Sequence, residues 1–338
     1  MWNVIGQNTA LDYLKKSFGA KRLSHAYLFV GPPQVGKMTL ALNLSQAVNC
    51  TSEKHEKPCS SCSQCCRTLE GNHTDVEIIK AYEASKNGTT RHSIGIDQIR
   101  ELQHKLNLKP FEGAFRVTIF EDSERMTEEA SNALLKTLEE PPSQSLLILL
   151  ASQETQLLPT IRSRCIRIKL NPMPVNEIID HIVTNHSIKE DTAHLIGRLS
   201  KGCLGWAIEA SRNPHILADR AIQMDRMLDL MDSDLEHRFR ESDDLVTTLY
   251  NDRREAMQIL REWLGIWRDL MLIQNNSVNL ITNIDYMTTL KSRSIKYSSD
   301  QIINTINTMQ ISIDSLANNV NPRLAIETIM LMIPRNTN

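Results

Sequence analysis

Apolar residues in the first half of the chain follow two kinds of pattern. Nearly continuous or alternating apolar runs predict strands at 26–30, 76–79, 116–120, 145–151 and 164–170. Apolar residues spaced three or four apart predict helices at 6–22, 40–48, 97–106 and 127–138. Strands that alternate with helices indicate an α/β domain with a mainly parallel sheet.

The remainder of the chain has a different pattern. After Asn171-Pro172 the strand pattern fades, and residues 174–212 read as a small helical unit with glycine-rich turns. Residues 215–338 read as helical, and within them Trp263 and Trp267 share one apolar helix face. These tryptophans are either anchors of an interface or an ordinary core. Loops are expected at 83–93, 275–285 and 291–300, and no clear periodicity marks 51–74.

Composition narrows the class of protein. The 338 residues are 41% hydrophobic and 23% charged, which is ordinary for a globular chain of two or three domains. A net charge of −2 argues against a protein that coats nucleic acid. A chain with this net charge can still carry a local basic face. No apolar run approaches the about 20 residues of a membrane span. The first residues lack the features of a secretory signal, so a cytoplasmic protein without a membrane partner is expected.

A glycine-rich loop stands between the first expected strand and helix. Gly31 and Gly36-Lys37 have the spacing of a Walker A motif, in which backbone N–H groups wrap phosphates and the lysine reaches the terminal ones. The next position normally binds Mg²⁺ through Ser or Thr, but Met38 offers only a thioether. Thr39 is one position late, about 100° round the helix. The loop therefore either holds ATP with weak or altered Mg²⁺ binding, or binds nothing.

Two acids follow the strand at 116–120. An ATPase of this type needs Asp to organise Mg²⁺ and then Glu to polarise water, whereas here the order is Glu121-Asp122. Each carboxylate is thus displaced by one methylene, and a displacement of about 1 Å can cost about 100-fold in rate. The pair is either a degraded part of a nucleotide site or two solvated acids at a strand end.

Cysteines are crowded into one segment. Five of the seven lie within residues 50–66. Four of them have spacings that suit one tetrahedral Zn²⁺ with Zn–S bonds of about 2.3 Å, namely Cys50, Cys59, Cys62 and Cys65. Four cysteine ligands leave no open position, so such a site is structural. An iron–sulfur cluster and a chance grouping of reduced thiols are the alternatives, and Cys66 is expected to face away.

Longer motifs add a family resemblance over nearly the whole chain. They are residues 24–29 (SHAYLF), 96–100 (IDQIR), 132–142 (NALLKTLEEPP), 161–165 (IRSRC) and 321–327 (NPRLAIE). With the Walker A-like loop and the four cysteines, they make the chain resemble the bacterial DNA polymerase III clamp-loader subunits of the AAA+ class. The NALLKTLEEPP run and the Ser-Arg-Cys triplet are the specific parts of this resemblance.

The resemblance implies an architecture and a set of partners. It implies an AAA+ P-loop core over 1–171 with a zinc module at 50–66, a helical lid over 172–212 and an all-α collar over 213–338 that serves oligomerisation. It implies a hetero-pentamer with delta and tau/gamma subunits, which opens the ring-shaped sliding clamp and places it on primer-template DNA. Structural Zn²⁺ is the implied cofactor, and binding of ATP with Mg²⁺ stays open.

One residue role also follows from the resemblance. In this family the arginine of the Ser-Arg-Cys triplet is an arginine finger, which reaches the γ-phosphate of ATP held by a neighbouring subunit. That role falls on Arg164. A guanidinium supplied in trans neutralises charge that builds on the transferred phosphoryl group. The alternative is that Arg162, Arg164 and Arg167 are solvated charges beside an edge strand.

The type of subunit is indicated by what the nucleotide site lacks. ATP-hydrolysing subunits of the tau/gamma type carry a lid pattern Gly-x-x-Arg-x-Ala, and here residues 202–207 (GCLGWA) place Gly205 at the arginine. Together with Met38 and Glu121-Asp122, three elements that act in cis are degraded, whereas Arg164 remains. This resembles the delta-prime family, whose members complete a neighbour's site without hydrolysing ATP. The alternatives are a tau/gamma-type motor and a different AAA+ or zinc-bearing repair or recombination factor.

Overall fold

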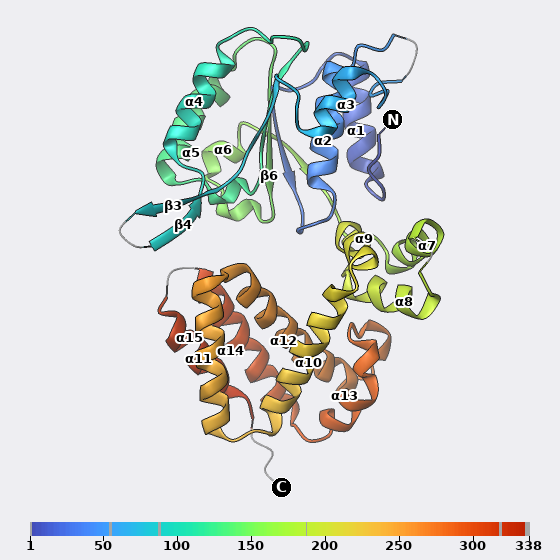
Figure 1. The fold of residues 1–338 in the computed structure, drawn as a ribbon, viewed down its shortest axis with the longest axis vertical. Coiled ribbons are helices and arrows are strands. Elements are labelled where there is room, and N and C mark those ends of the chain that lie inside the picture. The colour runs from blue at the N-terminus through green and yellow to red at the C-terminus, as the bar shows by residue number, and fades with distance from the viewer. Residues whose placement is uncertain (1, 54–55, 87–88, 187, 318–319, 335–338) are drawn as a thin grey trace. The chain divides into compact units, whose positions relative to one another are not determined.

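The chain folds into two compact units. The computed structural model describes residues 2–53, 56–86, 89–186, 188–317 and 320–334 (Figure 1). Short pieces of the expected segments lie outside these described residues. They include 54–55 of the zinc module, 87–88 of the loop at 83–93, 187 of the lid, and 318–319 and 335–338 of the collar. The first unit comprises Met1–Pro174 with Gly202–Trp206, and the second comprises Val175–Lys201 with Ala207–Asn338.

A parallel sheet forms the centre of the first unit. Its strands are β1 (Ala26–Val30), β2 (Val76–Ile79), β5 (Arg116–Phe120), β6 (Ser145–Ala151) and β7 (Ile166–Lys169). The order across the sheet is β2-β5-β6-β1-β7, with all neighbours parallel, which confirms the predicted α/β class. Every residue of β1 and β6 is buried, which explains why their sequences are continuously apolar.

Helices cover both faces of this sheet (Figure 1). One face carries α1 (Asn8–Gly19) and α2 (Lys37–Asn49), while the other carries α4 (Ile96–Leu106), α5 (Glu128–Glu139) and α6 (Pro159–Arg162). Successive residues of β1 point to opposite faces, so Phe29 packs with the first set and Leu28 with the second. Because the strands are parallel, their carboxyl ends lie at the same edge of the sheet, where β1 continues into the Walker A-like loop.

Three irregular segments proved more regular than expected. The prediction of a loop at 83–93 was wrong, because β3 (Tyr82–Lys86) and β4 (Thr89–Ser93) pair as a two-stranded antiparallel sheet. Such a ribbon is held by backbone hydrogen bonds, and its polar sequence gives no apolar alternation to detect. Segment 51–74 contains α3 (Ser63–Glu70), and α13 (Met287–Ser294) and α14 (Ser299–Ala317) take up both ends of the loop expected at 291–300.

The second unit is all helical in its described residues. Its helices are α7 (Val175–His186), α8 (Glu190–Leu199), α10 (His215–Asp232), α11 (Leu235–Asn251), α12 (Arg253–Gln274), α13, α14 and α15 (Pro322–Met332). Trp263 and Trp267 of α12 are fully buried in its core, so of the two alternatives for these residues the ordinary core is correct. Arg198 of α8 donates to the carbonyl oxygens of Asn279 and Ile281, which ties α8 to the segment before α13.

Helix α9 (Leu204–Arg212) begins in the first unit and continues into the second. Among the described residues, no helix has the length and the apolar character that crossing a membrane requires.

Candidate functional site

The Walker A-like loop is built as the spacing of its glycines predicts. The Gly31 N–H donates to the carbonyl oxygen of Ala151 at 3.2 Å, and a Cβ at Gly31 would lie 2.6 Å from the carbonyl oxygen of Leu170. Gly36 has φ +107°, a conformation that favours glycine, and is the N-cap residue of α2. The close approach at Gly31 and the backbone conformation at Gly36 therefore each require glycine.

Lys37 folds back onto its own loop. Its ammonium donates to the carbonyl oxygens of Gly31 at 2.5 Å and Pro32 at 2.9 Å. Burial lowers the pKa of Lys37, while the carboxylates of Glu124 and Asp122 oppose that shift. The loop thus holds its lysine through internal hydrogen bonds, which a phosphate ligand would have to compete with or rearrange.

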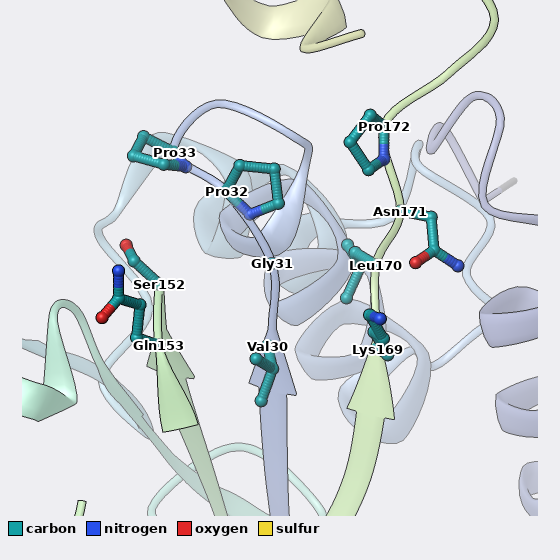
Figure 2. Close-up of a pocket in the computed structure, with 10 residues that line it drawn as sticks. All are labelled: Val30, Gly31, Pro32, Pro33, Ser152, Gln153, Lys169, Leu170, Asn171 and Pro172. Carbon is teal, nitrogen blue, oxygen red and sulfur yellow. The ribbon is translucent and has the colours of Figure 1, made fainter. Parts of the chain in front are cut away.

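A hollow of about 380 Å³ borders the first half of the loop (Figure 2). It lies over the carboxyl ends of β6, β1 and β7. Its lining consists of residues from these strand ends and from the start of the loop, namely Val30, Gly31, Pro32, Pro33, Ser152, Gln153, Lys169, Leu170, Asn171 and Pro172. Lys37 and the acids after β5 are outside this lining, so the hollow and the predicted metal-binding residues do not coincide.

The residues at the positions expected to bind Mg²⁺ contact other parts of the protein or the solvent. Met38 packs against the core of the first unit, and Thr39 is exposed to solvent. Glu121 pairs with Lys80 at 3.2 Å, whereas Asp122 has φ +53° and pairs with Arg125 at 3.6 Å. The structure therefore brings Gly31, Gly36 and Lys37 together at the end of β1, but engages both predicted acids with basic side chains.

A third acid was missed by the sequence reasoning. Glu124 lies in a short 3₁₀ turn after β5, and its Oε1 accepts a hydrogen bond from the backbone N–H of Ser152 at 2.9 Å. Its Oε2 is buried without a hydrogen-bond partner among the described residues. Three acids follow the strand within four positions, and no spacing rule singles out the one that turns towards the end of β6.

Gly205 is pressed against the loop. Its N–H donates to the carbonyl oxygen of Gln34 at 3.0 Å, and a Cβ there would lie 2.6 Å from the same oxygen. Real Cβ atoms do not approach backbone so closely, so any larger residue requires a shift of loop or helix. The structure thus gives a packing reason for glycine at the position where the tau/gamma pattern has arginine.

The four predicted cysteine ligands come together. Cys50 follows α2, Cys59 and Cys62 lie in the loop before α3, and Cys65 lies in α3. Their sulfur atoms are all within 4.8 Å of one another, and those of Cys59 and Cys65 are 3.9 Å apart. A tetrahedral site with Zn–S bonds of about 2.3 Å places its sulfur atoms about 3.8 Å apart. The donor set and its spacing therefore fit a metal such as zinc, and Cys66 is outside the group.

Electrostatics in this cluster differ from thiol to thiol. Backbone hydrogen bonds from Ser61 and Cys62 lower the pKa of Cys59 to about 5. Burial raises the pKa of Cys65, and the neighbouring Cys62 and Cys50 raise it further. Backbone N–H groups that stabilise a thiolate are also typical of structural metal sites, because the ligand is the deprotonated sulfur.

Arg164 lies at the surface between α6 and β7. Its side chain is 36% exposed, and its Nη2 pairs with Oε1 of Glu139 at 2.7 Å. Its Nη1 donates to the carbonyl oxygen of Thr160 at 3.0 Å. Arg167 lies nearby on β7 and pairs with Glu154 at 2.6 Å. Glu139, which is the last residue of α5, had no role in the sequence reasoning, since it is 25 positions from Arg164.

Known proteins resemble this chain over different lengths. The DNA polymerase III subunit delta′ of Bacillus subtilis is 28% identical over 97% of this chain and 96% of its own length. The tau/gamma subunit of Haemophilus influenzae is 33% identical over 66% of this chain, and the tau subunit of Escherichia coli is 28% identical over 80%. The chain spans only 31% and 44% of these last two relatives.

A solved structure and a family match complete the comparison. A DNA polymerase III gamma subunit-related protein of Thermotoga maritima has the same fold, with a TM-score of 0.50 and 22% identity over 96% of this chain and 98% of that one. The family described as DNA polymerase III, delta subunit, matches residues 6–174, which is half of the chain. The chain therefore belongs to the DNA polymerase III delta subunit family.

Proposed function

We propose that this chain is a delta-prime-type subunit of the DNA polymerase III clamp loader, which hydrolyses no ATP itself and completes the ATP site of a neighbour through Arg164. The delta′ relative supports this assignment because its similarity covers 97% of this chain, whereas the similarity of the tau/gamma and tau relatives covers 66% and 80% of it. The proposed place of action is the cytoplasm, in a hetero-pentamer with delta and tau/gamma subunits that loads the sliding clamp onto primer-template DNA.

One observation carries the proposal. The elements that would act in cis are engaged in other contacts, since Glu121 and Asp122 pair with basic side chains and Gly205 packs on the loop. Arg164 is also ion-paired, with Glu139, and its side chain is 36% exposed at the surface. A site whose two expected metal-binding acids are paired with basic side chains, together with a surface arginine, suits a subunit that acts on a neighbour's phosphates.

The other parts have proposed roles in the same assembly. Residues 1–171 are the AAA+ core, 172–212 the lid and 213–338 the collar that closes the pentamer. Cys50, Cys59, Cys62 and Cys65 would hold a structural Zn²⁺, which ties the end of α2 to α3. Gly31, Gly36 and Lys37, with Thr39 displaced and Glu121-Asp122 paired elsewhere, would be remnants of a nucleotide site.

Steady-state ATP turnover tests the proposal. The isolated chain is expected to show no turnover above background, and Lys37→Ala is expected to change nothing. In the reconstituted loader, Arg164→Ala is expected to remove the share of clamp- and DNA-stimulated turnover that belongs to one site, because an arginine finger contributes about 10³–10⁵ in rate. Arg167→Ala is the matched control, since it also removes an ion-paired surface arginine nearby.

A tau/gamma-type motor is the second candidate, and the retained Lys37 and the tau relatives favour it. Turnover by the isolated chain that Lys37→Ala abolishes would establish this alternative and exclude the delta-prime assignment. Unchanged turnover of the loader with Arg164→Ala would exclude the finger role.

A further inference from the structure

The guanidinium of Arg164 is already oriented within this chain. Nη2 contacts Oε1 of Glu139 at 2.7 Å, and Nη1 contacts the carbonyl oxygen of Thr160 at 3.0 Å and Oγ of Ser163 at 3.4 Å. Glu139 belongs to α5, whereas Thr160 and Ser163 belong to α6 and the turn after it. The side chain therefore bridges two elements of the first unit.

Glu139 stands at an unfavourable place for an acid. It is the last residue of α5, where the helix dipole presents partial negative charge and favours cations. The end of the helix is also held in place, because Nε2 of His25 lies 3.1 Å from the carbonyl oxygen of Leu138 and Pro141-Pro142 follows. The backbone that carries Glu139 is thereby held in place, and Arg164 supplies the positive charge that compensates the carboxylate.

We propose that Glu139 is a positioning residue for the arginine finger, which fixes the direction of the Arg164 guanidinium before a neighbouring subunit binds. This inference rests on the proposed role of Arg164. A guanidinium has five N–H donors in a rigid plane, so the contacts to Thr160, Ser163 and Glu139 leave donors for phosphate oxygens. A side chain that is already oriented loses less freedom when it meets a phosphate, and that gain appears in the rate of the chemical step.

The test uses the reconstituted loader with clamp and primed DNA. We expect Glu139→Ala to lower the kcat of stimulated ATP turnover about 10-fold at the affected site with an unchanged KM, because orientation acts on the transition state. Glu139→Gln keeps an oxygen that accepts from Nη2, and we expect it to restore most of the rate. Glu140→Gln is the matched control, since Glu140 is the exposed neighbour of Glu139.

A double variant distinguishes positioning from other roles. If Glu139 acts through Arg164, Arg164→Ala with Glu139→Ala together should be no slower than Arg164→Ala alone. Additive losses would overturn the proposal, as would a kcat of Glu139→Ala equal to or above the wild-type value. If Glu139→Ala impairs assembly on gel filtration, Glu139→Met, which keeps the length of the side chain without an acceptor oxygen, decides by the same criteria. If Arg164→Ala does not change the turnover, the proposed function fails. If Arg164→Ala lowers the turnover but Glu139→Ala does not, only this inference is refuted.

Discussion

Gly205 donates its backbone N–H to the carbonyl oxygen of Gln34 across 3.0 Å, so the first turn of α9 rests directly on the Walker A-like loop. No side chain separates the two backbones at this point, and a Cβ at Gly205 would lie 2.6 Å from that oxygen. Helix and loop therefore depend on each other at a position where a single methyl group decides the fit.

Gly205→Ala is expected to destabilise the chain by about 1–3 kcal/mol, because the added methyl group forces backbone to move. Alanine favours a helix over glycine by about 1 kcal/mol, so a loss of stability has to come from the close contact. Thermal unfolding measures the change. Gly265→Ala in α12 is the control, since a Cβ there meets nothing within 4 Å, and it should be neutral or stabilising. Equal effects of the two variants would contradict this interpretation.

The cysteine cluster gives a second prediction. Protein purified under reducing conditions without chelator is expected to contain one equivalent of zinc, measured by elemental analysis. Cys59→Ser is expected to lose the metal and to lower the thermal midpoint, because binding to a preformed four-thiolate site stabilises the fold. Cys165→Ser, which is outside the cluster, should keep the zinc. Retention of a full equivalent by Cys59→Ser would exclude the four-cysteine site.

Asp75 predicts how stability responds to acid. Its carboxylate is fully buried, and burial alone would raise its pKa, but N–H groups of Phe111, Glu112 and Gly113, each at 2.8 Å, and Arg116 hold the pKa below the ordinary 3.8. The unfolded chain then binds more protons between the two pKa values, so this stabilisation is present above pH 3.8 and is lost as pH falls through the lower, folded value.

Asp75→Asn should remove that part of the acid sensitivity and cost about 1–3 kcal/mol at neutral pH, since an amide offers only one oxygen to three donors. Urea unfolding at several pH values measures both effects. An unchanged slope of stability against pH below 3.8 would show that other carboxylates account for it.

A buried acid in the second unit gives a fourth prediction. Asp269 is fully buried in α12 and accepts hydrogen bonds from the backbone N–H groups of Thr282 at 3.1 Å and Asn283 at 2.8 Å. Asp269→Ala leaves these donors without a partner and should cost about 3 kcal/mol. Arg268→Ala removes a half-exposed ion-pair partner and its hydrogen bond to Oγ1 of Thr282, and should cost less than about 1 kcal/mol. Similar losses in chemical denaturation would instead assign the stability to the ion pair.

Local patterns predicted the parts of the fold that depend on neighbours in sequence. The strand, loop and helix around Gly31 and Lys37 follow from apolar runs and glycine spacing, and the four cysteines follow from their own spacing. The contacts of Gly205 with Gln34 and of Arg164 with Glu139 join residues far apart in the chain. The periodicity of apolar residues does not predict such contacts, because they depend on how whole helices pack in the folded chain.

The same limit applies to the acids after β5. Sequence order pointed to Glu121 and Asp122, but the left-handed backbone at Asp122 starts a turn that leaves Glu124 against the end of β6. Glu124 thus has a buried carboxylate oxygen, whereas Glu121 and Asp122 pair with Lys80 and Arg125. The polar ribbon of β3 and β4 was missed for a related reason. Its strands pair through backbone hydrogen bonds, and these require no pattern of apolar residues in the sequence.

The path of the chain between its two units has a further consequence. It passes from one to the other after Pro174, after Lys201 and after Trp206, so the first unit contains a short return segment, Gly202–Trp206. A single proteolytic cut after Pro174 would release two fragments, each holding part of the first unit. The fragment that starts at Val175 holds the whole second unit together with the return segment, which contacts the other fragment through the hydrogen bond from Gly205 to Gln34. The two fragments are therefore expected to co-purify after the cut.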